Sequence, residues 1–183
     1  AATSGTITVE FSNGDQIDAK IVGRDKAYDL AKYTHANFPD NPFFHRYLAR
    51  SAFMTGKLDQ AMELSKDILL KIGQHQIGYE ATSGRYASYI LGYYYLYIFK
   101  NPVDAKKYFN ECLSFSKQTD SMDSGYYWAS VLGLARIAFQ ESNYDQAVDY
   151  CKEVLDKADR KSSQHTEAKK LLAEAKKARR KRK

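Results

Sequence analysis

The side chains best suited to catalysis or metal binding are few and widely spaced in this sequence. They are His35, His45, His75, His165, Cys112 and Cys151. The histidines show no paired ligand spacing and the cysteines form no Cys-x-x-Cys motif, so neither a metal site nor a disulfide framework is expected. No phosphate-binding glycine loop, Gly-x-Ser-x-Gly elbow or His-Glu-x-x-His motif occurs. The sequence therefore predicts a protein that is not an enzyme and uses no metal or cofactor.

One stretch near the N-terminus is similar to part of an enzyme family. Residues 7–31, which include Phe11-Ser12-Asn13-Gly14-Asp15, resemble a strand pair of HtrA-type serine proteases. That resemblance implies that Asp29 matches the aspartate of a catalytic triad. No histidine precedes Asp29, and no Gly-x-Ser-Gly-Gly nucleophile motif follows it. A triad without its base and nucleophile cannot run that chemistry, so we interpret the similarity as a coincidence or a remnant.

Tyrosine and a basic C-terminus dominate the composition. The chain of 183 residues has 15 tyrosines and one tryptophan, and tyrosine combines a flat apolar body with a polar tip that suits binding surfaces. Nine of the 28 basic residues but only one of the 22 acidic residues follow position 168. The rest of the chain, with 19 basic and 21 acidic residues, is close to neutral. The net charge of +6 therefore describes a tail and does not indicate a nucleic-acid-binding body.

Targeting and membrane signals are not visible in the sequence. No apolar run approaches the roughly 20 residues of a membrane span, and no signal-peptide pattern occurs. These observations favour the cytoplasm over the cell envelope and leave the compartment open. The chain begins with Ala1 and not Met, which leaves open whether it is processed or a piece of a longer protein.

Apolar spacing divides the chain into an N-terminal extension and a helical body. In residues 6–21, apolar and polar side chains alternate on both sides of Asn13-Gly14, a pattern that favours a short β-hairpin. From residue 24 onward the spacing is helical, and the breaks define eight helices joined by short turns. The expected helices cover about 25–37, 43–54, 58–72, 79–99, 103–117, 124–140, 144–158 and 163–179. The sequence thus predicts an all-α fold of antiparallel helix pairs, because short turns join helices that lie side by side.

Three of these helix pairs share one template. Each first helix has a large apolar residue beside a small one, at Leu48-Ala49, Leu91-Gly92 and Leu134-Ala135. Each second helix has an alanine one turn from its start; these are Ala61, Ala105 and Ala147. Small side chains at matched positions let paired helices approach closely. We expect three helix pairs with the same packing.

The template resembles the tetratricopeptide-repeat (TPR) family. The best match is Leu91, Gly92, Tyr95, Ala105 and Phe109, and residues 134–155 match nearly as well. The resemblance covers about residues 25–158 and implies an α-solenoid. The alanines lie 44 and 42 residues apart, against about 34 in the standard repeat, so the repeats are elongated and degenerate. The implied organisation is an extension over residues 1–23, a TPR-like repeat domain over 24–162, and a basic capping helix with its tail over 163–183.

The resemblance also implies a binding groove, because the first helix of each pair lines the inner face of such a solenoid. The side chains expected there are Phe43, Arg46, Tyr47, Arg50, Tyr86, Tyr89, Tyr93, Tyr97, Arg136 and Phe139. The four tyrosines step by three or four residues and share one helical face. Tyrosine and arginine are enriched at binding hot spots, and arginine forks suit carboxylates. We expect a peptide or partner protein of acidic and aromatic character; the alternative is that the tyrosines simply pack between helices.

The C-terminal helix carries a second candidate surface. Leu171, Leu172 and Ala175 would let it cap the last repeat. The basic tail that follows comprises Lys176, Lys177, Arg179, Arg180, Lys181, Arg182 and Lys183. Its sequence fits a solvated helix end, or a salt-sensitive contact with nucleic acid, an acidic protein or anionic lipid.

Overall fold

Eight helices and two strands make up the part of the chain that the structure describes. The computed structural model describes all residues except 1–4, 11–15, 22–25, 123–124 and 182–183. The helices are α1 (Lys26–Asn37), α2 (Pro42–Met54), α3 (Leu58–Gly73), α4 (Ala81–Tyr97), α5 (Pro102–Gln118), α6 (Gly125–Gln140), α7 (Tyr144–Lys157) and α8 (Ser163–Lys181). The predicted all-α class is confirmed, and each predicted helix is present with ends that differ by at most two residues.

The strands precede the helices. Strand β1 (Gly5–Glu10) pairs antiparallel with β2 (Gln16–Ile21), in a register that places Gly5 opposite Ile21 and Glu10 opposite Gln16. Strand β2 contacts α1. The Asn13-Gly14 turn on which the hairpin prediction rests lies outside the described residues, so the hairpin as a whole stays a prediction.

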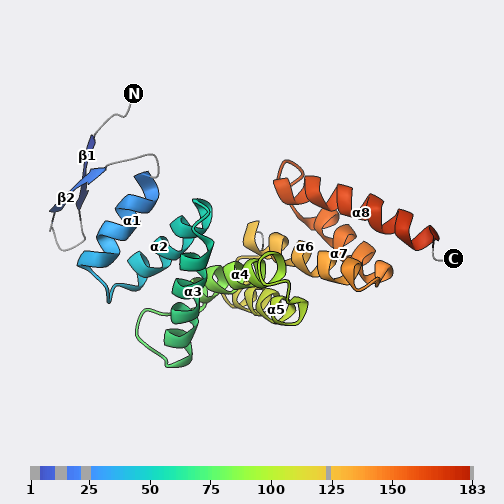
Figure 1. Cartoon of the computed structure of the whole chain (residues 1–183), viewed down its shortest axis with the longest axis horizontal. Helices are drawn as coiled ribbons and strands as arrows, with labels where there is room; N and C mark the ends of the chain where they lie inside the picture. Colours follow the sequence, from blue (N-terminus) through green and yellow to red (C-terminus); the bar gives the residue numbers. More distant parts are fainter. Residues whose placement is uncertain (1–4, 11–15, 22–25, 123–124, 182–183) are drawn as a thin grey trace.

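The helices follow one another along the long axis of the molecule, with the strands near one end and α8 near the other (Figure 1). Each helix packs against its neighbours in sequence. The even-numbered helices also contact one another in series, α2 with α4, α4 with α6, and α6 with α8. The first helices of successive pairs therefore lie next to one another, and the odd-numbered helices pack beside them.

The turns within the three repeated pairs share one backbone feature, a residue in the left-handed conformation. Five residues before each matched alanine stands a residue with positive φ: Gly56 at 77°, Lys100 at 55° and Ser142 at 61°. A left-handed residue ends a helix by turning the chain so that the last carbonyls find donors. Each matched alanine then donates its amide to the carbonyl four residues earlier, over 3.0–3.1 Å. The turns thus repeat in geometry as well as in sequence.

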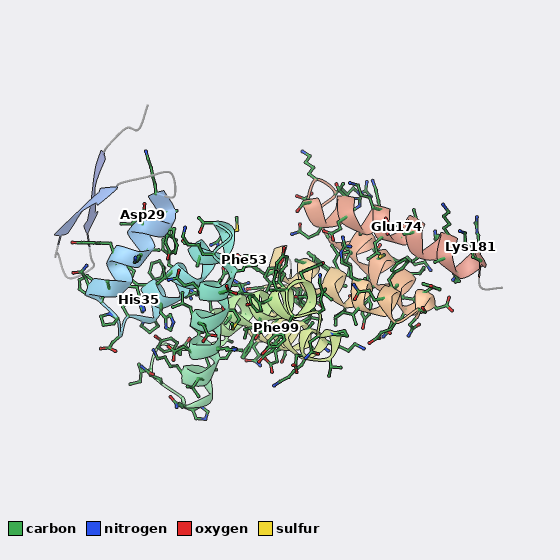
Figure 2. The ribbon with its side chains drawn as sticks, in the orientation of Figure 1. Asp29, His35, Phe53, Phe99, Glu174 and Lys181 are labelled. Carbon is green, nitrogen blue, oxygen red and sulfur yellow. The ribbon has the colours of Figure 1, made fainter. Side chains whose placement is uncertain are left out.

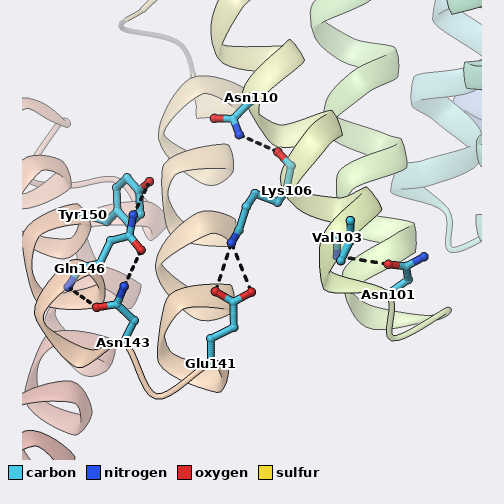
Figure 3. A network of polar contacts seen from close by, with 8 residues as sticks. All are labelled: Asn101, Val103, Lys106, Asn110, Glu141, Asn143, Gln146 and Tyr150. Carbon is cyan, nitrogen blue, oxygen red and sulfur yellow. Dashed lines mark hydrogen bonds and ion pairs between the residues drawn. The ribbon is translucent and has the colours of Figure 1, made fainter.

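Asparagine side chains start the second helix in two of these pairs (Figure 3). Asn101 Oδ1 accepts the amides of Val103 and Asp104, and Asn143 Oδ1 accepts the amide of Gln146. Such caps satisfy amides that have no partner within the helix. Lys106 of α5 reaches the carboxylate of Glu141, which follows the end of α6, with Nζ 3.1 and 3.2 Å from its two oxygens. This exposed pair links one helix pair to the next.

The matched small residues are buried where the helices meet. Ala61, Ala105 and Ala147 are each the fourth residue of their helix and are fully buried. The buried ring of Phe109 lies against Gly92 of α4 and Gly133 of α6. A Cβ atom added at Gly92 would lie 2.6 Å from Cδ1 of that ring, and one at Gly133 would lie closer still. Glycine on both flanking helices is what gives Phe109 its place in the core.

Candidate aromatic and arginine surface

Nine of the ten predicted groove residues come together on α2, α4 and α6, in one continuous series of contacts. The rings of Phe43 and Tyr47 stack on α2 with centroids 6.2 Å apart. Arg46 places its guanidinium carbon 5.4 Å from the Phe43 centroid and 5.9 Å from that of Tyr86. The series of contacts therefore passes from α2 to four tyrosines of α4. We call these four residues the tyrosine ladder; they are Tyr86, Tyr89, Tyr93 and Tyr97.

The tyrosine ladder packs edge to face with aromatic rings that were not among the predicted groove residues. Tyr126 of α6 meets Tyr86 and Tyr89 with centroids 4.7 and 5.1 Å apart. Phe53 of α2, labelled in Figure 2, meets Tyr89 and Tyr93 at 5.8 and 5.0 Å. Such pairs contribute roughly 0.5–1.5 kcal/mol each beyond the area that they bury. Spacing within one helix could not identify these partners, because they come from neighbouring helices.

The four tyrosines are all half-buried but differ in their surroundings. Tyr89 is the most enclosed by other rings, because it also approaches Phe109, with centroids 6.4 Å apart. Burial raises the pKa of its hydroxyl well above the usual range, and burial likewise raises the pKa of Tyr97. Tyr93 and Tyr97 lie against each other with centroids 4.6 Å apart. The alternative of packing between helices therefore describes Tyr89 best, whereas the other three have fewer neighbouring rings.

A pocket of about 320 Å³ opens beside the ladder. Its walls come from four helices: Tyr89, Tyr93 and Tyr97 of α4, Phe109 of α5, Ala129, Leu132, Gly133 and Arg136 of α6, and Glu167 of α8. Aromatic walls with a few polar groups are typical of binding pockets. The core and the pocket share residues, because Phe109 and Gly133 lie against each other and both line the pocket wall.

The charged end of the pocket is an ion pair. Arg136 donates Nε and Nη2 to Oε1 of Glu167, over 2.9 and 2.5 Å. From the sequence, Arg136 is expected to face a partner carboxylate. In the structure α8 already supplies one, and both side chains are about two-fifths exposed. A ligand at this end of the pocket would consequently meet an arginine that is already paired with a carboxylate.

Phe139 is the one predicted groove residue that lies elsewhere. Its ring meets Tyr144 of α7 with centroids 5.5 Å apart and packs with Leu172 of α8 against buried residues such as Ala147 and Val148. That side of α6 faces α7 and α8. Phe139 thus stands apart from the other nine residues, because α7 and α8 cover this end of α6.

Three arginines gather at the opposite end of the ladder. Arg46 and Arg50 of α2 and Arg85 of α4 place their guanidinium carbons 5.9, 5.7 and 4.8 Å from the centroid of the Tyr86 ring. Arg50 also lies 6.0 Å from the Tyr126 centroid. We call Arg46, Arg50 and Arg85 the arginine cluster. Arg85 was not among the predicted groove residues, although it stands four residues before Tyr89.

A histidine pair is a further feature that the sequence does not reveal. His35 of α1 and His45 of α2 stack with centroids 5.0 Å apart, and His45 Nδ1 lies 3.0 Å from the hydroxyl of Tyr79. Burial, together with nearby Lys71, lowers the pKa of His45 to about 4 and lowers the pKa of His35 too. The two histidines stand on different helices, with a spacing that carries no sequence signal. Within the described residues, no group of three histidine, cysteine or acidic side chains is placed to hold a metal ion.

The tail continues α8 as helix up to Lys181, near the end of the molecule (Figure 2). Leu171 and Ala175 are buried against α6 and α7, as the capping role requires. Lys176, Lys177, Arg180 and Lys181 are exposed, and Arg179 donates to Oδ1 of Asp145 over 2.8 Å. Arg182 and Lys183 lie outside the described residues. No helix among the described residues has the length and apolar content needed to cross a membrane.

The chain was compared with protein-family models, with curated proteins and with solved structures, and none of the three comparisons gave a match.

Proposed function

We propose that this protein is a protein-interaction scaffold, a TPR-like α-solenoid that holds a peptide or a partner protein along α2, α4 and α6. The repeated turns and the serial contacts of the even-numbered helices support the solenoid arrangement. In such an array the first helices of each pair form the inner surface. The tyrosine ladder and the arginine cluster both belong to these first helices.

The observation that carries the proposal is the tyrosine ladder with its 320 Å³ pocket. Tyr93 and Tyr97 line the pocket with half-buried rings, so that a ligand could bury their remaining surface. Rigid aromatic side chains lose little conformational entropy on binding and supply a large contact area. We propose that the pocket accepts an apolar or aromatic side chain of the partner, while acidic groups of the partner meet the arginines.

A peptide-display library selected on the immobilised full chain tests the groove. Selected peptides should lose at least about tenfold in affinity for Tyr93→Ala and for Tyr97→Ala, measured by calorimetry. Tyr108→Ala is the matched control: Tyr108 of α5 is also half-buried, but its ring stacks on Tyr95 and not on the ladder. Peptides that bind all three variants equally well would contradict the groove.

Melting temperatures separate binding from packing. If the ladder serves mainly as core, Tyr93→Ala should lower the melting temperature by much more than Tyr108→Ala and weaken peptide binding only through unfolding. If the ladder binds a partner, the two variants should melt at similar temperatures and differ in affinity. Tyr89→Ala is unsuitable alone, because Tyr89 packs on Phe53, Phe109 and Tyr126.

The exposed basic residues of α8 favour a second candidate function, salt-sensitive binding of nucleic acid or an anionic surface. Arg179 pairs with Asp145, but Lys176, Lys177, Arg180 and Lys181 have no ion pair among the described residues. Binding through such a run would follow charge and not sequence. Deleting the residues after Ala175 should abolish retention on heparin at low salt. Unchanged retention would rule out the tail as a binding element.

A further inference from the structure

We propose that the arginine cluster is a binding site for a doubly charged oxyanion, the phosphoryl group of a phosphorylated side chain on the partner. The identity of this ligand rests on the proposed function, because we place the phosphoryl group on a peptide that binds in the same groove. The site itself rests on the geometry of Arg46, Arg50 and Arg85, and it can be tested with inorganic phosphate alone.

The three guanidinium groups converge on one ring. Arg46 and Arg50 stand four residues apart on α2, so both project from one helical face towards α4. Arg85 approaches the same Tyr86 ring from α4, and its Nη2 donates to the Tyr86 hydroxyl over 3.1 Å. The three guanidinium carbons lie 5.9, 5.7 and 4.8 Å from the ring centroid. A ligand beside this ring would meet positive charge from two helices.

This charge has no internal counterion among the described residues. No ion pair joins Arg46, Arg50 or Arg85 to a carboxylate there, whereas Arg136 pairs with Glu167. Glu111 of α5 accepts a hydrogen bond from Ser88 of α4 over 3.4 Å, and among the described residues no ion pair joins its carboxylate to Arg85. Three like charges within 6 Å of one ring centroid repel one another, and such repulsion grows where water is excluded. Binding of an anion would relieve it.

Arg85 is the residue that makes the cluster unusual. Its side chain is 8% exposed, and its buried Nε has no hydrogen-bond partner. A buried guanidinium without a counterion is destabilising, by the general rule for unpaired buried charge. Interaction with the Tyr86 ring, 4.8 Å away, offsets part of that penalty. The guanidinium of Arg85 keeps its full positive charge, which adds to the field of Arg46 and Arg50 and strengthens the attraction of an anion held by them.

The number and kind of donors favour a phosphoryl group over a single carboxylate. Each guanidinium carries five N–H donors in a planar fork that matches carboxylate or phosphate oxygens. Arg50 is exposed and Arg46 half-buried, so both can offer such forks to a ligand. A phosphoryl group has three acceptor oxygens and a charge near −2 at neutral pH. It would therefore neutralise two of the three charges, whereas a carboxylate would neutralise one.

Calorimetric titration of the full chain with inorganic phosphate at a pH of about 7.5 and constant ionic strength tests the site. The wild type should bind phosphate at one saturable site, and Arg46→Gln/Arg50→Gln should weaken binding at least about tenfold. Arg180→Gln/Lys181→Gln is the matched control, because it removes the same charge from the exposed tail and should bind like the wild type. These four side chains lie outside the closely packed core, so both double variants should fold.

Three outcomes would overturn the site: equal affinity of the Arg46→Gln/Arg50→Gln variant, loss of binding in the tail control instead, or acetate that binds as tightly as phosphate. Arg85→Gln provides a second measurement. It should weaken phosphate binding, and circular dichroism will report whether this buried substitution retains the helices.

Phosphorylated and unphosphorylated forms of one groove-selected peptide then test the occupant. The phosphorylated form should bind at least about tenfold more tightly, and inorganic phosphate should compete with it. If inorganic phosphate binds but phosphorylation adds no affinity, the peptide occupant is overturned while the anion site stands. If no peptide is selected but phosphate binds, the proposed function fails independently of the site.

Discussion

The ring of Phe109 in α5 lies directly against Gly133 in α6, at a distance that leaves no room for a Cβ atom. Gly92 of α4 meets the same ring from the other side. Phe109 is among the most deeply buried side chains of the described core and also lines the pocket beside the tyrosine ladder. Core packing and the candidate binding surface therefore share Phe109 and Gly133.

Gly133→Ala should lower the free energy of unfolding by about 2 kcal/mol, because the added methyl group must displace a ring that is enclosed on both sides. Chemical denaturation measures the loss. Gly73→Ala is the control: Gly73 ends α3 with nothing within 4 Å of an added Cβ, and it should be neutral or slightly stabilising. If the loss comes from overpacking, Phe109→Leu should recover part of it in the Gly133→Ala background. No recovery would contradict this explanation.

The histidine pair predicts acid sensitivity. Because the pKa of His45 in the folded protein is about 4, below the ordinary histidine value of 6.5, the unfolded chain binds more protons between these pH values. The stability that this group contributes is thus complete above a pH of 6.5 and is lost as the pH falls towards 4. From this group alone, the free energy of unfolding should decrease by about 2 kcal/mol between about pH 7 and about pH 5.

Urea denaturation at both pH values checks this expectation. His45→Gln should remove most of the decrease, whereas His75→Asn, at an exposed position with φ of 55°, should retain it. The charged and titratable groups around His45 are His35, Asp67, Lys71 and Tyr79. An equal pH dependence in His45→Gln and the wild type would show that other groups cause the loss.

The two cysteines should be unreactive in the folded protein. Cys112 and Cys151 are free and buried, and burial raises the pKa of both thiols to about 11. At about pH 8 the thiolate, which is the reactive form, should be roughly a hundredfold scarcer than for an exposed thiol with a pKa of 9.0. A thiol-reactive disulfide reagent should therefore label them slowly in buffer and rapidly in urea. Rapid labelling without denaturant would contradict the burial.

The repeated turns predict opposite effects of two substitutions. Gly56 and Lys100 occupy matched positions with φ of 77° and 55°, a region that costs non-glycine residues roughly 1 kcal/mol. Gly56→Ala should destabilise the protein by about 1 kcal/mol, and Lys100→Gly should stabilise it by up to about that amount. Thermal unfolding of both variants measures the effects. Two shifts of the same sign would show that the turns are not equivalent.

Features that depend on local periodicity could be predicted from the sequence. Helix ends follow from caps and breaks such as Asn101-Pro102, and the burial of Ala105 follows from its matched position. Contacts between side chains of different helices could not be predicted, because they depend on how the helices pack together. Arg136 pairs with Glu167, and Phe139 packs with Leu172 against a buried cluster that includes Ala147, because α8 covers the end of α6. Likewise, the arginine cluster forms through packing of α2 on α4, which no spacing along one helix reveals.

Contacts between the described helices join elements that are at most two apart in sequence. Because the described helices make no contacts between elements far apart in sequence, the contact order is low. In repeat arrays of this kind, folding can begin at any helix pair and spread to its neighbours. Duplicating or excising a whole pair at the turns would create one new junction between helices and would leave the contacts within each remaining pair in place.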